Sequence, residues 1–190
     1  MTIRTTIIAS TALLALAACG KNADTAQNST VANAQMGDTG VANSATPVAS
    51  AAQDFANTAA ASDAFEIATS QAALTQGSSA AVKTYARKMI DAHTASTAKL
   101  KTAAAEVSPA VTPDATLTAE QQQQLDQLKA LSGSAFDRAY ITQQSAAHQQ
   151  TLDALKAYAA SGDAPALKTF ATGLIPTVTA HLNMAKGLKA

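Results

Sequence analysis

FEIATSQAALTQGSSAAVKTYARKMIDAHT, residues 65–94, holds the end of one helix, a tight turn and the start of a second helix. Gly77 is typical of a helix C-terminus, and Ser78 or Ser79 can accept hydrogen bonds from the first free amides of the following helix. A link this short makes the two helices an antiparallel hairpin. The stretch therefore predicts a fold built from paired helices.

Three further breaks divide the rest of the body. The first holds two prolines (SPAVTPDATL, 108–117), and the others are SGS (132–134) and SGDAP (161–165). The helices expected between these breaks span 54–76, 79–106, 119–131, 135–160 and 164–188. No segment alternates with period two, so no strand is expected. The sequence predicts an all-α protein, an up-and-down four-helix bundle with an extra short helix between its second and third long helices.

Two helix starts carry the spacing of a capping box. Thr118 and Gln121 precede the short helix, and Ser134 and Asp137 precede the third long helix. In such a box the first side chain accepts a hydrogen bond from the backbone amide three residues later. The spacing predicts that Asp137 stabilises the start of its own helix, where the helix dipole favours an acid.

The three histidines of the chain lie at corresponding positions of three long helices. His93, in KMIDAHTASTAKL (88–100), shares a helical stripe with Met89 and Leu100, and His148 and His181 lie on the apolar stripes of their own helices. At 1.5 Å per residue, all three and Glu66 of the first long helix fall in the middle third of the bundle. We expect a buried polar layer at that depth.

This layer has two interpretations. In the first, the core histidines are hydrogen-bonded to one another, to Glu66 or to trapped water, and the network fixes the register of the helices. In the second, Glu66, His93, His148 and His181 hold one divalent metal ion such as zinc. A carboxylate-bridged di-iron centre is not expected, because it needs Glu-x-x-His on two helices, and no glutamate stands three residues before any histidine.

The N-terminus predicts export and a lipid anchor. MTIRTTIIASTALLALAAC (1–19) has a short apolar run, and its end resembles the lipobox of bacterial lipoproteins, in which Cys19 becomes lipidated. Gly20 follows the cysteine, and no Asp there resembles an inner-membrane retention signal, so we expect the outer membrane. Residues 20–53 are polar and predict a disordered tether, and 54–190 form the helical domain.

The composition limits the function classes. Thirteen Lys and Arg balance thirteen Asp and Glu, and Trp is absent. Without a basic patch or a surface of stacked aromatic residues, no nucleic-acid partner is expected. No nucleophile–base motif or phosphate loop is identified, so an enzyme is not indicated. The partner expected from sequence is the membrane, and no protein partner is identified.

Three segments together resemble a known family. FEIATSQAALTQGSSAAVKTYARKMIDAHT (65–94), FDRAYITQQSAAHQQTLDAL (136–155) and LIPTVTAHLNMA (174–185) look like the family called domain of unknown function 4142. The resemblance implies a ferritin-like helical bundle in a bacterial envelope protein with no assigned reaction. One departure concerns the metal hypothesis: the family usually has an acid immediately before the second-helix histidine, where this chain has Ala92.

The hypotheses from sequence are thus two. The first is a membrane-tethered, non-enzymatic helical domain that binds a partner or supports the envelope. The alternative is a metal-binding protein with a mononuclear, histidine-rich core site.

Overall fold

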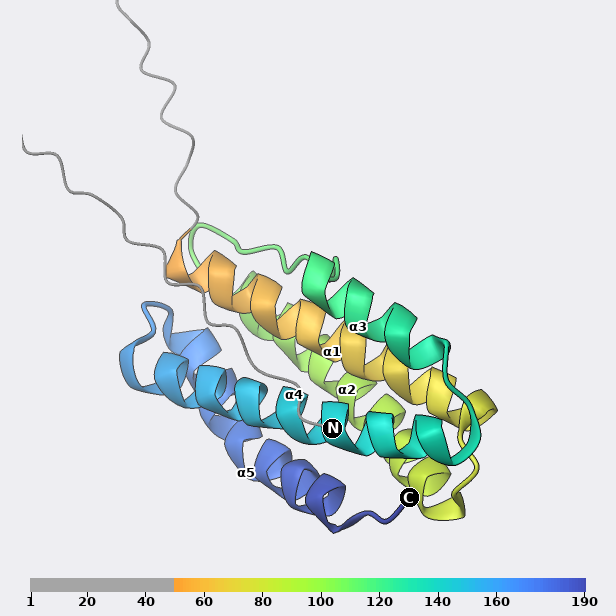
Figure 1. The fold of residues 1–190 in the computed structure, drawn as a ribbon. Coiled ribbons are helices and arrows are strands. Elements are labelled where there is room, and N and C mark those ends of the chain that lie inside the picture. Colours follow the sequence, from red (N-terminus) through yellow and green to blue (C-terminus); the bar gives the residue numbers. More distant parts are fainter. Residues whose placement is uncertain (1–49) are drawn as a thin grey trace, which may run out of the picture. The chain divides into compact units, whose positions relative to one another are not determined.

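The computed structural model describes residues 50–190, which fold into five helices with no strand in that range (Figure 1). The helices are α1 (Ala51–Gln76), α2 (Ala80–Ala105), α3 (Ala119–Lys129), α4 (Gly133–Ser161) and α5 (Pro165–Gly187). The all-α prediction is confirmed, including the short helix between the second and third long ones. The predicted signal peptide, its Cys19 and the tether up to residue 49 lie outside the described residues.

The four long helices pack in two pairs. Helix α1 lies along α2 and α4 lies along α5, and the pairs meet where α1 contacts α4 and α2 contacts α5. Helix α3 lies against α1 and α4 (Figure 1). None of the helices in this part of the chain is long and apolar enough to span a membrane.

Local capping sets several helix starts. Ser79 caps α2, accepting from the amide of Val82 at 3.4 Å. Thr118 and Gln121 form the predicted capping box of α3, with reciprocal bonds of 3.1 and 3.0 Å. Helix α1 begins at Ala51 with Ser50 as its cap, three residues before the predicted start, because the Ser50 hydroxyl satisfies an otherwise free amide of the first turn.

The predicted capping box at the start of α4 is wrong. This helix begins at Gly133 after Ser132, which makes no side-chain cap. Asp137 is instead fully buried and caps the neighbouring hairpin turn, accepting from the amides of Ser78 at 3.2 Å and Ser79 at 2.9 Å and from the Ser78 hydroxyl. A Cβ on Gly77 would stand 2.7 Å from the backbone oxygen of Ala73 and 2.9 Å from Asp137 Oδ1, so the turn requires glycine at this position.

The core consists of two apolar clusters separated by a polar layer. Along α2, Met89 belongs to one cluster and Leu100 to the other, and His93 lies between them. Along α4, Tyr140 and Leu152 flank His148 in the same way. The buried polar members of this layer are Asp63, Glu66, Thr69, Ser70, His93, Ser96, Gln144, His148 and His181. The polar layer expected from the sequence therefore lies inside the bundle.

Candidate metal centre

The structure brings the three histidines together. His93 of α2, His148 of α4 and His181 of α5 are all buried, with 5%, 1% and 8% of their surface exposed. Their ring centroids are 5.5 to 5.9 Å apart. Each ring faces the other two because each histidine lies on the inward stripe of its helix, at a depth that the antiparallel packing brings into register.

Hydrogen bonds at Nδ1 fix the orientation of two of the three rings. Nδ1 of His93 lies 2.8 Å from Oδ1 of Asp63, and Nδ1 of His148 lies 2.9 Å from the backbone carbonyl oxygen of Gln144. Both partners are acceptors, so each Nδ1 carries the proton that it donates. The other nitrogen of each neutral ring, Nε2, keeps its lone pair.

Three buried ring nitrogens have no hydrogen-bond partner among residues 50–190: Nε2 of His93, Nε2 of His148 and Nδ1 of His181. One nitrogen from each histidine lies within 4.8 Å of those of the other two. Buried polar atoms are normally paired, so an unpaired nitrogen on each of three neighbouring rings needs an explanation, and a bound cation or an ordered water molecule would supply the missing partner.

The donor set fits a transition-metal ion. Imidazole nitrogens bind zinc and copper, with zinc–nitrogen bonds of about 2.0–2.1 Å, so three bound nitrogens would lie about 3.5 Å apart. The observed limit of 4.8 Å is wider than that spacing. Small side-chain movements would therefore complete the coordination. The set contains no carboxylate, which disfavours magnesium and calcium because those ions prefer oxygen.

Glu66 lies in the same layer but outside the group of converging nitrogens. Its Oε1 is 3.6 Å from Nδ1 of His148, the nitrogen that faces away from the unpaired set, and neither of its oxygens has a hydrogen-bond partner within the described chain. Burial raises the pKa of Glu66 to about 7, although the positive charge of His93 opposes this shift. Its carboxylate is a nearby buried acid rather than a fourth member of the cluster.

Asp63 is the residue of this site that sequence reasoning missed. It is buried and lies three residues before Glu66, so the two acids share one face of α1. The alanine-rich composition of α1 obscured which face points inward. The helical spacing of the two acids was the signal that could have identified it.

The electrostatics keep two of the rings neutral. Burial, with the positive charge of His93 as a second cause, lowers the pKa of His148 to about 3 and that of His181 to about 4. Burial alone would lower the pKa of His93, but the hydrogen bond to Asp63 and the charges of Glu66 and Asp63 hold it above its ordinary value. Neutral imidazole is the form that binds metals.

A small hollow of about 30 Å³ adjoins the centre. Its lining includes His93, His181 and Asp63 together with Ser96 of α2 and Thr177 of α5. Thr177 is exposed, so the hollow lies between the centre and the surface where α2 and α5 meet. The hollow has room for one water molecule.

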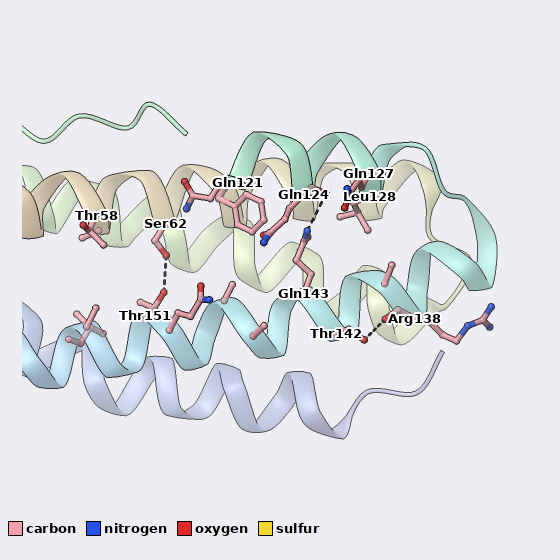
Figure 2. Close-up of a pocket in the computed structure, with 18 of the residues that line it drawn as sticks. Thr58, Ser62, Gln121, Gln124, Gln127, Leu128, Arg138, Thr142, Gln143 and Thr151 are labelled. Atoms are coloured by element: carbon pink, nitrogen blue, oxygen red, sulfur yellow. Dashed lines mark hydrogen bonds between the residues drawn. The ribbon is translucent and has the colours of Figure 1, made fainter. Parts of the chain in front are cut away.

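A second, larger cavity of about 700 Å³ lies between α1, α3 and α4. Figure 2 shows amide side chains of α3 and α4 along it, including Gln124 and Gln143, and the 2.8 Å hydrogen bond between Ser62 and Thr151 that joins α1 to α4. None of the three histidines lines this cavity. It is therefore distinct from the candidate metal centre.

Comparison with known proteins identifies the family. Residues 37–188 match the family described as Domain of unknown function (DUF4142), and the chain belongs to it. A solved structure described as "CopM in the Cu(I)-bound form" is similar in fold, with a TM-score of 0.55 and 21% sequence identity, over 72% of this chain and 93% of that chain. No match was found among curated proteins.

Proposed function

We propose that this member of the DUF4142 family is an envelope lipoprotein that binds one copper ion through His93, His148 and His181. We propose that its fold is a ferritin-like, up-and-down four-helix bundle. The observation that carries the proposal is that three buried histidines each have an unpaired ring nitrogen and each offer one ring nitrogen within 4.8 Å of those of the other two. A core network of direct hydrogen bonds would pair these nitrogens with protein groups, whereas none of the three has a partner within residues 50–190.

Copper suits this donor set for two reasons. Copper stands at the top of the affinity order of divalent first-row metals for nitrogen ligands. Three imidazoles, once His93 has lost its proton, also leave a coordination position open, which suits a trigonal copper ion as well as the open, three-histidine type of zinc site. The Cu(I)-bound form of the structural neighbour supports copper as the first ion to test.

The chain's own residues supply binding rather than catalysis. The bundle holds the three rings at one depth between two apolar clusters. The acceptors bonded to Nδ1 of His93 and of His148 fix the tautomers of these two rings. The copper ion would supply its redox chemistry when bound. The proposal is a copper-holding protein at the membrane, attached through Cys19.

Metal analysis of the mature protein, purified without an affinity tag, tests the proposal. We expect close to one copper per chain after incubation with Cu(I) under reducing conditions, and a strong loss of copper in His93→Leu, His148→Leu and His181→Leu. Met89→Leu is the matched control, because Met89 is a buried sulfur-bearing side chain one turn before His93 that lies in the apolar cluster. Equal copper in the parent and in the histidine variants would refute the site.

The same experiment separates the two sequence hypotheses. If the parent binds neither copper nor zinc, and His93→Leu is tolerated or mildly destabilised whether or not chelator is present, the layer is a structural network. If zinc binds stoichiometrically and copper does not, the site is metal-binding but the ion is zinc.

The proposed membrane anchoring of the protein is tested separately. Cys19→Ser should move the protein from the membrane fraction to the soluble fraction of the envelope, because it removes the atom that would carry lipid. A variant as membrane-bound as the parent would contradict the lipid anchor.

A further inference from the structure

We infer that Asp63 is the positioning residue of the metal centre: it fixes His93 for coordination and provides a buried negative charge beside the ion. This inference rests on the proposed copper site. It goes beyond that site because Asp63 is outside the converging nitrogens and would contribute through His93.

The contacts of Asp63 occupy both of its oxygens. Oδ1 lies 2.8 Å from Nδ1 of His93, and Oδ2 lies 3.1 Å from the hydroxyl of Thr97. Thr97 stands one turn after His93 on α2, and its single hydroxyl proton is shared between Asp63 Oδ2 and the backbone oxygen of His93, which is 2.9 Å away. The carboxylate of α1 is thereby anchored to the part of α2 that carries the first histidine.

This anchoring determines which nitrogen of His93 can bind a metal. A carboxylate accepts the Nδ1 proton, so the lone pair of the neutral ring is on Nε2, which is the unpaired nitrogen. Metal-binding histidines commonly donate their other N–H to such a carboxylate, which orients the ring and raises its basicity. Asp63 and His93 already have this arrangement.

Asp63 differs from the group that holds His148. His148 donates to a neutral backbone carbonyl, which carries no full charge. Glu66 stands 3.6 Å from His148, beyond hydrogen-bonding distance. Asp63 is therefore the one carboxylate in the described chain that is hydrogen-bonded to a ring of the centre.

The charge of Asp63 has a consequence that a purely structural hydrogen bond would not have. A buried carboxylate attracts a doubly charged ion more strongly than a singly charged one, and the low dielectric of the core strengthens both interactions. Asp63 should therefore stabilise Cu(II) more than Cu(I) and lower the reduction potential of the bound copper. Removing the charge should raise that potential.

The test compares Asp63→Asn with the parent and with Asp91→Asn. Asparagine can still accept the His93 proton but carries no charge, and Asp91 is an exposed acid two residues from His93 that gives the same chemical change on the surface. We expect Asp63→Asn to lower Cu(I) affinity about tenfold and Cu(II) affinity about a hundredfold. The difference corresponds to a reduction potential about 59 mV higher, and Asp91→Asn should match the parent.

The outcomes are distinguishable. A parent that binds no copper refutes the proposed function, and the inference falls with it. If the parent binds copper and Asp63→Asn keeps the parent's copper affinity and reduction potential, the inference about Asp63 is overturned but the proposed function stands.

If Asp63→Asn does not fold, Thr97→Val replaces it in the test. This variant frees one oxygen of the Asp63 carboxylate and keeps its charge. We then expect a smaller loss of Cu(I) affinity, and unchanged affinity would overturn the inference.

Discussion

Two buried carboxylates in this protein have opposite surroundings. Asp137, at the hairpin turn between α1 and α2, is 0% exposed and accepts hydrogen bonds from two backbone amides and a hydroxyl. Glu66, in the histidine layer, is 1% exposed, and neither of its oxygens has a partner within residues 50–190. Both acids are buried, but only Asp137 has hydrogen-bond partners for its carboxylate oxygens.

The difference separates a polar group whose hydrogen bonds stabilise the fold from polar groups that have no partner within the described chain. Leaving a buried polar atom unpaired costs about 1–3 kcal/mol, and more when the group is charged. The hairpin turn avoids this cost, whereas the histidine layer retains unpaired atoms on Glu66 and on all three rings. Sites that violate such rules are where function is expected.

The largest effect on stability is expected at the satisfied acid. Asp137→Ala leaves the amides of Ser78 and Ser79 without their acceptor, so we expect the free energy of unfolding to fall by about 3–4 kcal/mol. Chemical denaturation measures the change. Asp91→Ala, at an exposed acid on α2, is the control and should stay within about 0.5 kcal/mol of the parent. A loss below about 1 kcal/mol in Asp137→Ala would mean that water replaces the carboxylate.

The histidine layer should instead gain stability from a ligand. Copper at a free concentration 100-fold above its dissociation constant should raise the free energy of unfolding by about 2.7 kcal/mol, because only the folded chain presents the three nitrogens together. Thermal unfolding with copper and then with chelator measures the gain and its reversal. His148→Leu should show no gain, and an equal gain in that variant would place the copper elsewhere.

Glu66 should make the metal-free protein less stable as the pH rises. Its pKa is raised to about 7 from an ordinary 4.5, so between these values the folded state holds a proton that the unfolded chain has lost. The stability from this group is therefore present at low pH and is lost as the pH rises through 7. From pH 5 to pH 8 the parent should lose about 2 kcal/mol relative to Glu66→Gln. Parallel stability curves for the two proteins would show that Glu66 titrates normally.

An exposed polar group should matter least. Ser50 accepts from the amide of Gln53 at 3.1 Å at the surface-exposed start of α1, where water can replace it in part. Ser50→Ala should cost about 1 kcal/mol of unfolding free energy.

A chain beginning at residue 54 would lose this cap and the first helical residues, so it should unfold at a lower temperature than one beginning at 50. Identical melting temperatures would show that the first turn of α1 contributes nothing.

The starts of α3 and α4 show when a local sequence pattern predicts helix capping correctly and when it does not. The Thr118–Gln121 spacing correctly predicted a capping box, because both partners lie within one turn and need nothing from the rest of the fold. The same spacing at Ser134 and Asp137 predicted a box that does not form, because the amides of the α1–α2 turn compete successfully for Asp137. A local pattern fails where a distant partner provides more hydrogen bonds.

The sequence by itself determined the number and order of the helices, the turns between them and the inward stripes that carry the three histidines. These features depend on helical periodicity and on Gly, Pro and Ser at chain breaks, which act within a few residues. Only the tertiary structure decided that Asp63 pairs with His93, 30 residues away, and that Asp137 caps a turn 59 residues before it. Such pairings depend on the relative rotation and depth of packed helices, which the alanine-rich face of α1 does not encode in any short pattern.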